Sequence, residues 1–510
     1  MKIIHVCVIG AGISGLVAAK TFLEEGYDVT LFEKQKGVGG VWEKSRTYPG
    51  VTTQTVRDAY AFSDYPMPAS YPEWPTGEQV RNYLQSYAQH FSIIEKIQFG
   101  MEVTNVERKT GGCSKWVVTT KIQGETTKQK HEFDFVLICN GTANISNIPN
   151  LPGKEEFTAS GGKILHSSEF NDSSLIKGKR VVILGFGKSA CDIATFAAVN
   201  ASESTLIFRK ADWKIPMFFL GLINYKYVLL ARFAEAFFPK RQLQGMERWL
   251  HTVGKPLISA YWWMNEMLLR RQFRLESCGM LPKESLVKSV TCTLGLAPKG
   301  FYKHVLSGKI RSQQTSIAKF VAGGVCLANG EQLQADVVIF GTGFRQHIPF
   351  LEEKYRRLVM DEQGNFHLYR NLIHPEIPNL GFVGYNSSFF CPLTSEIGSW
   401  WLAESVNGNL ATPSPEEMYQ AIKAEKLWRY EQSYVSYGGT CVIPYSFYYI
   451  EQLLNDMGVS NQRQGWKKIQ EMMMPLNISA YKYVRQQLRD RKFSTGKSRR
   501  NTELLLRSIV

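Results

Sequence analysis

A glycine-rich turn between two apolar runs near the start of the chain constrains the fold more than any other feature. The run at residues 3–9 has the composition of a buried parallel strand, residues 13–25 have helical spacing, and a second strand ends at Glu33. The GxGxxG turn at 10–15 supplies one glycine for tight turning, one for backbone approach to a pyrophosphate, and one for close helix–strand packing. Since an acid after the second strand suits a ribose hydroxyl, this βαβ unit predicts a dinucleotide site.

The same pattern returns in the middle of the chain with one change of charge. Residues 179–184 predict a strand, GFGKSA at 185–190 repeats the fingerprint with alanine in its third small position, and a helix is expected over 192–199. The next strand is followed by Arg209, where the first copy has Glu33. A carboxylate favours a free ribose hydroxyl, whereas a guanidinium can neutralise a 2′-phosphate. We therefore predict FAD at the first copy and NADP, bound as NADPH, at the second.

The predicted fold class is α/β, with two Rossmann-like dinucleotide-binding domains, the second inserted into the first. Proline and glycine at 149–153 mark the first boundary. A late strand at 336–340, followed by GTGF, is assigned to the return into the first domain. The predicted division is 1–152 and 331–425 for the FAD domain, 153–330 for the NADPH domain with an apolar insert at 213–274, and 426–510 for a C-terminal helical extension with a basic tail.

Several secondary elements are expected outside the two fingerprints. Thr76 and Gln79 form a capping-box pattern that predicts a helix from residue 77 to about 90. Antiparallel strands are expected at 102–106, 116–121 and 130–138, followed much later by a strand at 380–384 and a helix around 396–407.

The composition narrows the classes of function. The formal charge of +15 suits polyanionic cofactors or a membrane surface, and no basic stripe or nucleic-acid-binding module accompanies it. The nine cysteines include no CxxC pair, which argues against a zinc site and against a disulfide reductase. No apolar run is long enough to span a bilayer. The chain is expected to be intracellular, either cytoplasmic or peripheral on the cytoplasmic face of a membrane.

The insert at 213–274 is rich in aromatic and aliphatic residues interspersed with lysine and arginine. Three interpretations stay open: an interfacial amphipathic element, a lid over an apolar substrate channel, or simply packed helices. Peripheral membrane contact and a homodimer are likewise left open.

Together these motifs resemble the class B flavoprotein monooxygenases, that is, the flavin-containing monooxygenases and their Baeyer–Villiger relatives. The similarity rests on GAGISG at 10–15, GGVW at 39–42, GFGKSACD at 185–192 and DVVIFGTGF at 336–344. The family pattern FxGxxxHxxx(Y/F) is matched by Gly162, His166 and Phe170, although Ser160 replaces the leading phenylalanine. The resemblance implies that His166 fixes the linker between the domains and helps to position NADP.

The resemblance also implies an activity. Members of the family are NADPH- and O2-dependent monooxygenases that form a C4a-(hydro)peroxyflavin. The resemblance therefore implies oxygenation of a small lipophilic N- or S-nucleophile, as in N,N-dimethylaniline monooxygenase activity. The asparagine that stabilises this species in the family corresponds to Gln54, eight positions before Phe62. RTYPG at 46–50 is similar to a Baeyer–Villiger motif, but the acid expected after it is absent, and His166 is not followed by the tryptophan of those enzymes. Baeyer–Villiger oxidation of a ketone, and a membrane-associated flavin-binding protein without activity, remain the alternatives.

No metal site is predicted. Gln54 is the one candidate catalytic residue. The residues predicted to hold the two cofactors are Gly10, Ala11, Gly12, Ile13, Ser14, Gly15, Glu33, Lys34, Gly40, Val41, Trp42, Gln54, Thr55, His166, Gly185, Gly187, Lys188, Ser189, Ala190, Asp192, Arg209, Gly341, Thr342 and Gly343.

Overall fold

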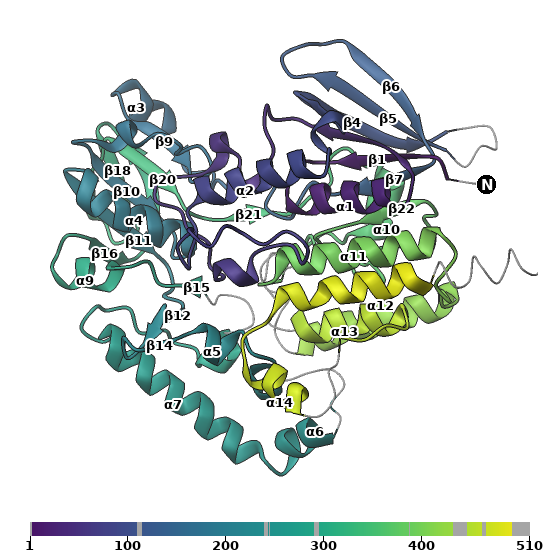
Figure 1. Cartoon of the computed structure of the whole chain (residues 1–510). Helices are drawn as coiled ribbons and strands as arrows, with labels where there is room; N and C mark the ends of the chain where they lie inside the picture. Colours follow the sequence, from purple (N-terminus) through teal and green to yellow (C-terminus); the bar gives the residue numbers. More distant parts are fainter. Residues whose placement is uncertain are drawn as a thin grey trace, which may run out of the picture.

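The computed structural model describes residues 3–109, 115–238, 243, 245–289, 295–386, 388–431, 446–461 and 466–491. Two five-stranded parallel sheets form the centres of two lobes within this part of the chain (Figure 1). The predicted basic tail from residue 492 onward, and parts of the predicted C-terminal extension, lie outside the described residues.

The first sheet confirms the predicted N-terminal βαβ unit. Its strands, in spatial order, are β22 (Leu380–Phe382), β7 (Phe135–Ile138), β1 (His5–Ile9), β2 (Asp28–Glu33) and β3 (Ile97–Phe99). The helix of the unit, α1 (Ile13–Glu24), packs against α11 (Cys391–Val406), which begins earlier than expected. Val6, Cys7 and Val8 are completely buried, which explains why this strand is apolar throughout rather than alternating.

The second sheet is built in the same way around the second fingerprint. Its strands, in spatial order, are β16 (Arg311–Gln314), β11 (Glu203–Phe208), β10 (Arg180–Leu184), β20 (Val337–Phe340) and β9 (Lys163–His166). The crossover helix α4 (Lys188–Asn200) begins four residues before its predicted start, directly after Gly187.

One assignment from the sequence is wrong. The strand at 336–340 was expected in the first domain, but β20 lies in the second sheet, where Val338 pairs with Val182 of β10 and with Ile164 of β9. A short, fully apolar strand suits the centre of either parallel sheet, so its composition could not tell the two apart. The chain leaves the second sheet only after Phe340.

Antiparallel strands extend both lobes. β4 (Met101–Arg108), β5 (Trp116–Ile122) and β6 (Lys128–Phe133) form one sheet, and β17 (Ile317–Val321), β18 (Gly324–Leu327) and β19 (Gln332–Gln334) form another. The strand predicted at 130–138 is in fact two strands, because Asp134 interrupts it and accepts the backbone N–H groups of Ile4 and His5. Helix α2 (Gly77–His90) confirms the predicted capping box.

The two chain crossings between the lobes run side by side. β8 (Ile145–Ser146) leads towards the second lobe and β21 (Phe344–Arg345) returns from it, and these strands pair antiparallel. The backbone N–H of Asn147 donates to the carbonyl of Gly343 at 3.0 Å. This pairing fits a second domain inserted into the first.

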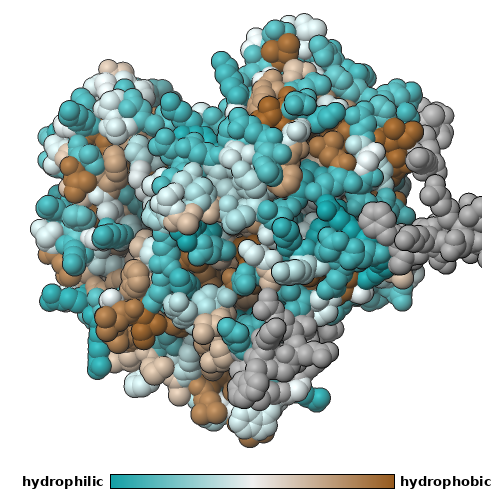
Figure 2. Space-filling view, viewed as in Figure 1, coloured by the Kyte–Doolittle hydropathy of each residue, from teal (hydrophilic) through white to brown (hydrophobic). Residues whose placement is uncertain are grey.

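The insert forms a separate layer, drawn in teal below the second sheet in Figure 1. It contains β12 (Lys214–Ile215), the hairpin β13 (Phe218–Phe219) and β14 (Ile223–Asn224), and helices α5 (Lys226–Leu229), α6 (Gly245–Thr252) and α7 (Lys255–Phe273). Helix α8 (Leu286–Ser289) and strand β15 (Gly295–Leu296), which pairs with β12, follow the insert. Apolar side chains gather on the surface around the hairpin (Figure 2), where Leu222 is 83% exposed. No helix within the described residues combines the length and apolar character needed to cross a membrane.

Three C-terminal helices, α12 (Pro415–Glu431), α13 (Ser446–Asp456) and α14 (Trp466–Met473), lie beside α11 and the insert (Figure 1). Shorter helices elsewhere are α3 (Lys154–Ala159), α9 (Phe301–Leu306) and α10 (Glu353–Val359).

Candidate cofactor and substrate site

The first glycine turn is built so tightly that two of its positions admit no side chain. Gly10 has φ +105°, and a Cβ there would lie 2.8 Å from the carbonyl oxygen of Cys139. A Cβ on Gly15 would lie 1.7 Å from the carbonyl oxygen of Gly10. These two glycines therefore serve the backbone turn and the packing of α1 on β1.

A second glycine loop lies against this turn. The N–H of Gly39 donates to the carbonyl of Ala11 at 3.0 Å, and a Cβ on Gly12 would lie 3.5 Å from the Cα of Gly40. The two loops predicted to contact FAD are thus neighbours at the carboxyl ends of β1 and β2, where ligands of parallel sheets bind.

Glu33 is the last residue of β2 and lies beside the first glycine turn. Its carboxylate is buried and accepts the backbone N–H groups of Ala11 at 2.7 Å and Gln35 at 2.8 Å. Burial raises the pKa of Glu33, and the two hydrogen bonds oppose that shift. A carboxylate offers about four acceptor positions, so capacity remains for a ribose hydroxyl. The neighbouring Lys34 is exposed.

The second turn uses its small residues differently. Gly185 has φ +129°, and a Cβ there would lie 2.4 Å from the carbonyl oxygen of Gly341. A Cβ on Gly341 would lie 2.6 Å from that of Ala190, so Gly341 makes room for helix packing. A Cβ on Gly187 would meet no described atom within 4 Å, which leaves the start of α4 open to a phosphate. Ser189 follows in the first turn of this helix.

Arg209 stands at the end of β11, where the second copy departs from the first. Its side chain is exposed, and no described residue forms an ion pair with it. The amide of Gln314 donates to its backbone carbonyl at 3.2 Å. The next residue, Lys210, is by contrast 2.9 Å from the carboxylate of Glu284. Of these two neighbouring cations, Arg209 is therefore the one that no described carboxylate pairs with.

Lys188 and Asp192 face each other rather than open space. They form an ion pair one helical turn apart, and the hydroxyl of Tyr48 donates to the same carboxylate at 2.9 Å. Burial raises the pKa of Asp192, and the charge of Lys188 opposes the shift. Tyr48 belongs to the first lobe, so this buried group ties the lobes together. The sequence indicated Asp192 but gave no sign of its bond to Tyr48.

His166 is the last residue of β9 in the second sheet and lies beside Gly343, where the chain returns to the first lobe. It is completely buried, with Nε2 at 2.9 Å from the carbonyl of Gly343 and Nδ1 at 2.8 Å from the Ser168 hydroxyl. Burial lowers the pKa of His166, which favours the neutral ring. The hydroxyl of Thr342 donates to the carbonyl of Asn147 beside it. A contact between His166 and NADP stays a prediction.

The aromatic loop between the fingerprints adds polar groups to the flavin side. The indole of Trp42 donates to the hydroxyl of Tyr60 at 3.0 Å, while Val41 is exposed. Thr55 donates its hydroxyl to the carbonyl of Phe389 at 2.8 Å. The buried hydroxyl of Thr53 has no hydrogen-bond partner among the described residues. Because a buried polar group is normally satisfied, the unpaired hydroxyl fits a site that receives a polar cofactor.

Two serines join the first turn to α11. The hydroxyl of Ser14, next to the buried Ile13, lies 3.0 Å from that of Ser395. A Cβ on Gly384, which has φ +89°, would lie 2.2 Å from the Ser14 hydroxyl. The start of α11 is therefore held against the fingerprint.

Gln54 borders a largely apolar cavity whose empty space, including space open to solvent, is about 580 Å³; it is here termed the flavin-side cavity because Gln54 is predicted to lie beside the flavin. Its side-chain carbonyl accepts the N–H of Leu296 at 3.2 Å, and its backbone carbonyl accepts the hydroxyl of Tyr225 at 2.6 Å. The side-chain NH2 of Gln54 is thereby left as a donor. Residues of the insert form part of the cavity wall. In the sequence, only the interpretation of the insert as a lid over a substrate channel indicated this contribution. The lining residues are Gln54, Ile215, Tyr225, Leu229, Leu230, Glu235, Phe238, Gly295, Leu296, Phe389, Phe390, Ser446 and Phe447.

Comparison with known proteins agrees with this geometry. The profile of flavin-binding monooxygenase-like proteins matches residues 3–462. The chain is 30% identical over 500 residues to "Probable flavin-containing monooxygenase 1" of Arabidopsis thaliana, covering 90% of this chain and 93% of that protein. It is 28% identical to the N-oxide-forming dimethylaniline monooxygenase 2 of Oryctolagus cuniculus, covering 81% and 75%.

Solved structures share the fold at lower identity. An oxidised steroid monooxygenase bound to NADP has a TM-score of 0.68 at 19% identity, covering 89% of this chain and 98% of that one. An S-allyl-L-cysteine S-oxygenase from Allium sativum has a TM-score of 0.61 at 20% identity, covering 98% and 99%. The fold, the paired glycine turns and the profile match over most of the chain lead to one assignment: the chain belongs to the flavin-binding monooxygenase-like family and is a flavin-dependent monooxygenase.

Proposed function

We propose that this enzyme uses NADPH and O2 to oxygenate a small lipophilic nucleophile at nitrogen or sulfur. The observation that carries the proposal is the contrast between the two turns. The first ends in the buried acceptor Glu33 and the second in the exposed Arg209, which forms no ion pair with any described residue. Bound FAD would supply oxygen activation and bound NADPH the hydride, while the protein supplies binding, orientation and exclusion of water.

The residues divide between the two cofactors accordingly. Gly12, Gly40 and Glu33 would hold the adenosine diphosphate part of FAD, with the flavin towards Gln54. Gly187, the start of α4 and Arg209 would hold NADPH. In this arrangement the side-chain NH2 group of Gln54, whose carbonyl oxygen accepts the N–H of Leu296, would act as a hydrogen-bond donor at the reacting side of the flavin.

The flavin-side cavity supports a lipophilic substrate, because aliphatic and aromatic side chains form most of its wall. Oxygenation at nitrogen or sulfur is favoured over ketone oxidation by the relatives. Identity reaches 30% with a plant flavin-containing monooxygenase, and is 18% with a cyclohexanone monooxygenase structure. Baeyer–Villiger oxidation is therefore the second candidate.

The exposed apolar hairpin of the insert supports peripheral contact with a membrane surface. Leu220, Leu222 and Ile223 are all more than half exposed there. Sedimentation with neutral and anionic vesicles tests this contact, and full recovery in the supernatant with both would contradict it.

The decisive experiment incubates the purified yellow protein with NADPH, air and one of three substrates: thioanisole, N,N-dimethylaniline or cyclohexanone. We expect sulfoxide or N-oxide in proportion to the NADPH consumed. NADPH oxidation that yields only hydrogen peroxide with all three would contradict the proposal. Lactone as the main product would replace it with the Baeyer–Villiger alternative.

A further inference from the structure

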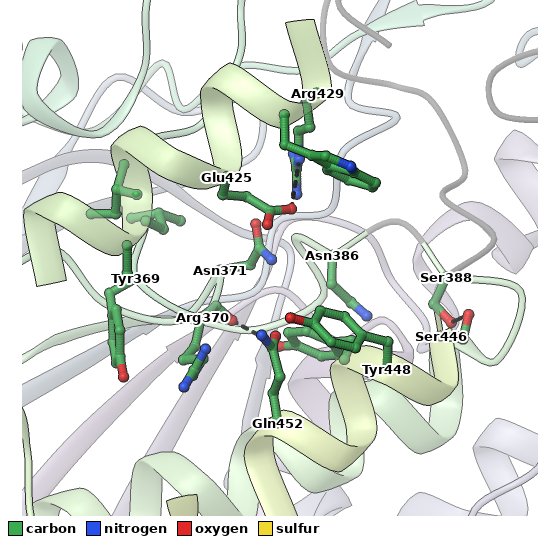
Figure 3. A pocket seen from close by; sticks show the side chains of 15 residues that line it. Tyr369, Arg370, Asn371, Asn386, Ser388, Glu425, Arg429, Ser446, Tyr448 and Gln452 are labelled. Atoms are coloured by element: carbon green, nitrogen blue, oxygen red, sulfur yellow. Dashed lines mark hydrogen bonds and ion pairs between the residues drawn. The ribbon is translucent and has the colours of Figure 1, made fainter. Parts of the chain in front are cut away.

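A second cavity, here termed the outer cavity, is lined by residues between Leu368 and Gln452 (Figure 3). The empty space among its lining residues is about 820 Å³, which includes space open to solvent. Two loops and two helices form it: the loop before β22, the loop after β22, helix α12 and helix α13. None of the residues predicted to bind FAD or NADPH lines it.

The charged groups at this cavity compensate one another. The guanidinium of Arg370 makes two hydrogen bonds of 2.8 and 2.9 Å to the carboxylate of Asp456. Arg429 lies 3.1 Å from the carboxylate of Glu425 on the same helix. Two compensated ion pairs give the cavity little net attraction for an ionic ligand, so a neutral ligand suits it better.

Two side-chain amides are available for recognition. Those of Asn371 and Gln452 face the cavity from opposite sides, and no described residue hydrogen-bonds either one (Figure 3). Each offers both donors and an acceptor. A ligand that carries its own amide or lactam could pair with them in both directions.

The backbone beneath Asn371 is held in an uncommon conformation. Arg370 and Asn371 have φ +55° and +54°, in the left-handed region that residues with side chains rarely adopt. The hydroxyl of Tyr449 donates to the carbonyl of Arg370 at 2.9 Å and fixes this turn. Such conformations persist where surrounding contacts hold them, and they are frequent at ligand sites.

Aromatic rings supply the apolar part of the cavity. Tyr369, Trp428, Tyr448 and Tyr449 all line it, together with Leu368 and Ile422. Flat rings favour a planar aromatic ligand through stacked or edge-to-face contacts. Rings and unpaired amides together select a neutral, planar aromatic molecule with an amide-like group.

The two cavities share one lining residue. Ser446 lines both of them, and its hydroxyl lies 2.6 Å from that of Ser388, which lines only the outer one. The residues that follow these serines, Phe389 and Phe447, line the flavin-side cavity. A molecule in the outer cavity is therefore next to the flavin-side cavity, which is the site of oxygenation under the proposed function.

We propose that the outer cavity is the recognition pocket for the substrate, and that this substrate is a neutral, planar aromatic molecule bearing an amide or lactam group. The inference rests on the proposed function, since it names the substrate class of that reaction. Asn371 and Gln452 bind the amide, and the soft nitrogen or sulfur of the same molecule is what the flavin-side cavity receives.

The test measures binding separately from turnover. Calorimetry on the FAD-loaded protein without NADPH compares para-methylthiobenzamide with thioanisole, which lacks the amide. The variants are Asn371→Gly, which keeps the left-handed backbone without strain, and Gln452→Ala. The control is Leu427→Ala, on α12 but 59% exposed and outside the cavity lining.

We expect each amide variant to weaken para-methylthiobenzamide about threefold to tenfold, as for one lost hydrogen bond, with thioanisole and the control unchanged. The inference is overturned if the wild type does not bind the amide at millimolar concentration, if the variants bind it as the wild type does, or if they lose both compounds equally. With NADPH and air, selective binding without sulfoxide would contradict the proposed function and leave the pocket standing. Sulfoxide formation with an unchanged KM in both variants would contradict the pocket assignment and leave the proposed function standing.

Discussion

Replacement of Arg209 by alanine tests the assignment of the second cofactor most directly. The guanidinium is exposed and unpaired among the described residues, so its loss breaks no contact within the protein. Folding stability should then change by less than about 0.5 kcal/mol. A charge-assisted hydrogen bond to phosphate contributes about 1.5–3 kcal/mol, which corresponds to about tenfold to a hundredfold in affinity. Because solvent screens an exposed charge, we expect the lower end, about tenfold.

The assay is the rate of flavin reduction as a function of NADPH and of NADH, measured by stopped flow without oxygen. Arg209→Ala should raise the apparent Kd for NADPH and leave that for NADH nearly unchanged. Lys210→Ala is the matched control, since this neighbouring cation is already paired with Glu284 and should alter the NADPH-to-NADH ratio by less than about threefold. An unchanged ratio in Arg209→Ala would refute the 2′-phosphate assignment.

Three further substitutions test other parts of the site. Gln54→Leu should leave flavin reduction intact but increase the hydrogen peroxide formed per NADPH, because the donor beside the flavin is lost; equal coupling would argue against its role. Gly15→Ala should abolish FAD retention or folding, since the new Cβ would lie 1.7 Å from the Gly10 carbonyl oxygen, and flavin absorbance of the purified protein measures this. Burial, and next the charge of Asp64, raises the pKa of Glu396 from its ordinary value of 4.5 to about 7. The native state then binds the extra proton between these values, so unfolding free energy should fall as pH rises from about 4.5 to about 7; Glu396→Gln should flatten this slope in urea titrations.

The sequence was sufficient for the two βαβ units because their constraints are local. The turn at Gly10 needs a positive φ, and the strand on each side must be apolar to be buried on both faces. The sheet to which β20 belongs was not predictable in this way. Its partners β9 and β10 lie more than 150 residues earlier, and nothing in a short apolar strand specifies a partner.

The residues of the site likewise divide into those that a local pattern identified and those that only the fold brings together. Glu33 and Arg209 were identified because each directly follows a strand of a recognisable unit. The bond between Tyr48 and Asp192 joins residues 144 positions apart, and neither residue type demands the other. The outer cavity likewise arises where two loops and two helices meet, so the amides of Asn371 and Gln452 carried no signal until the fold placed them opposite each other.

The alanine in the second fingerprint shows how two distant motifs depend on each other. In the first copy Gly15 is obligatory, because the Gly10 carbonyl occupies the place of its side chain. In the second copy Ala190 is accommodated because Gly341, directly after the neighbouring strand β20, has no Cβ where one would lie 2.6 Å away. The small residue required for helix–sheet packing is thus provided by the partner strand. Gly341, which the sequence predicts to contact a cofactor, is needed for this packing, and that need is intelligible only once β20 is placed beside β10.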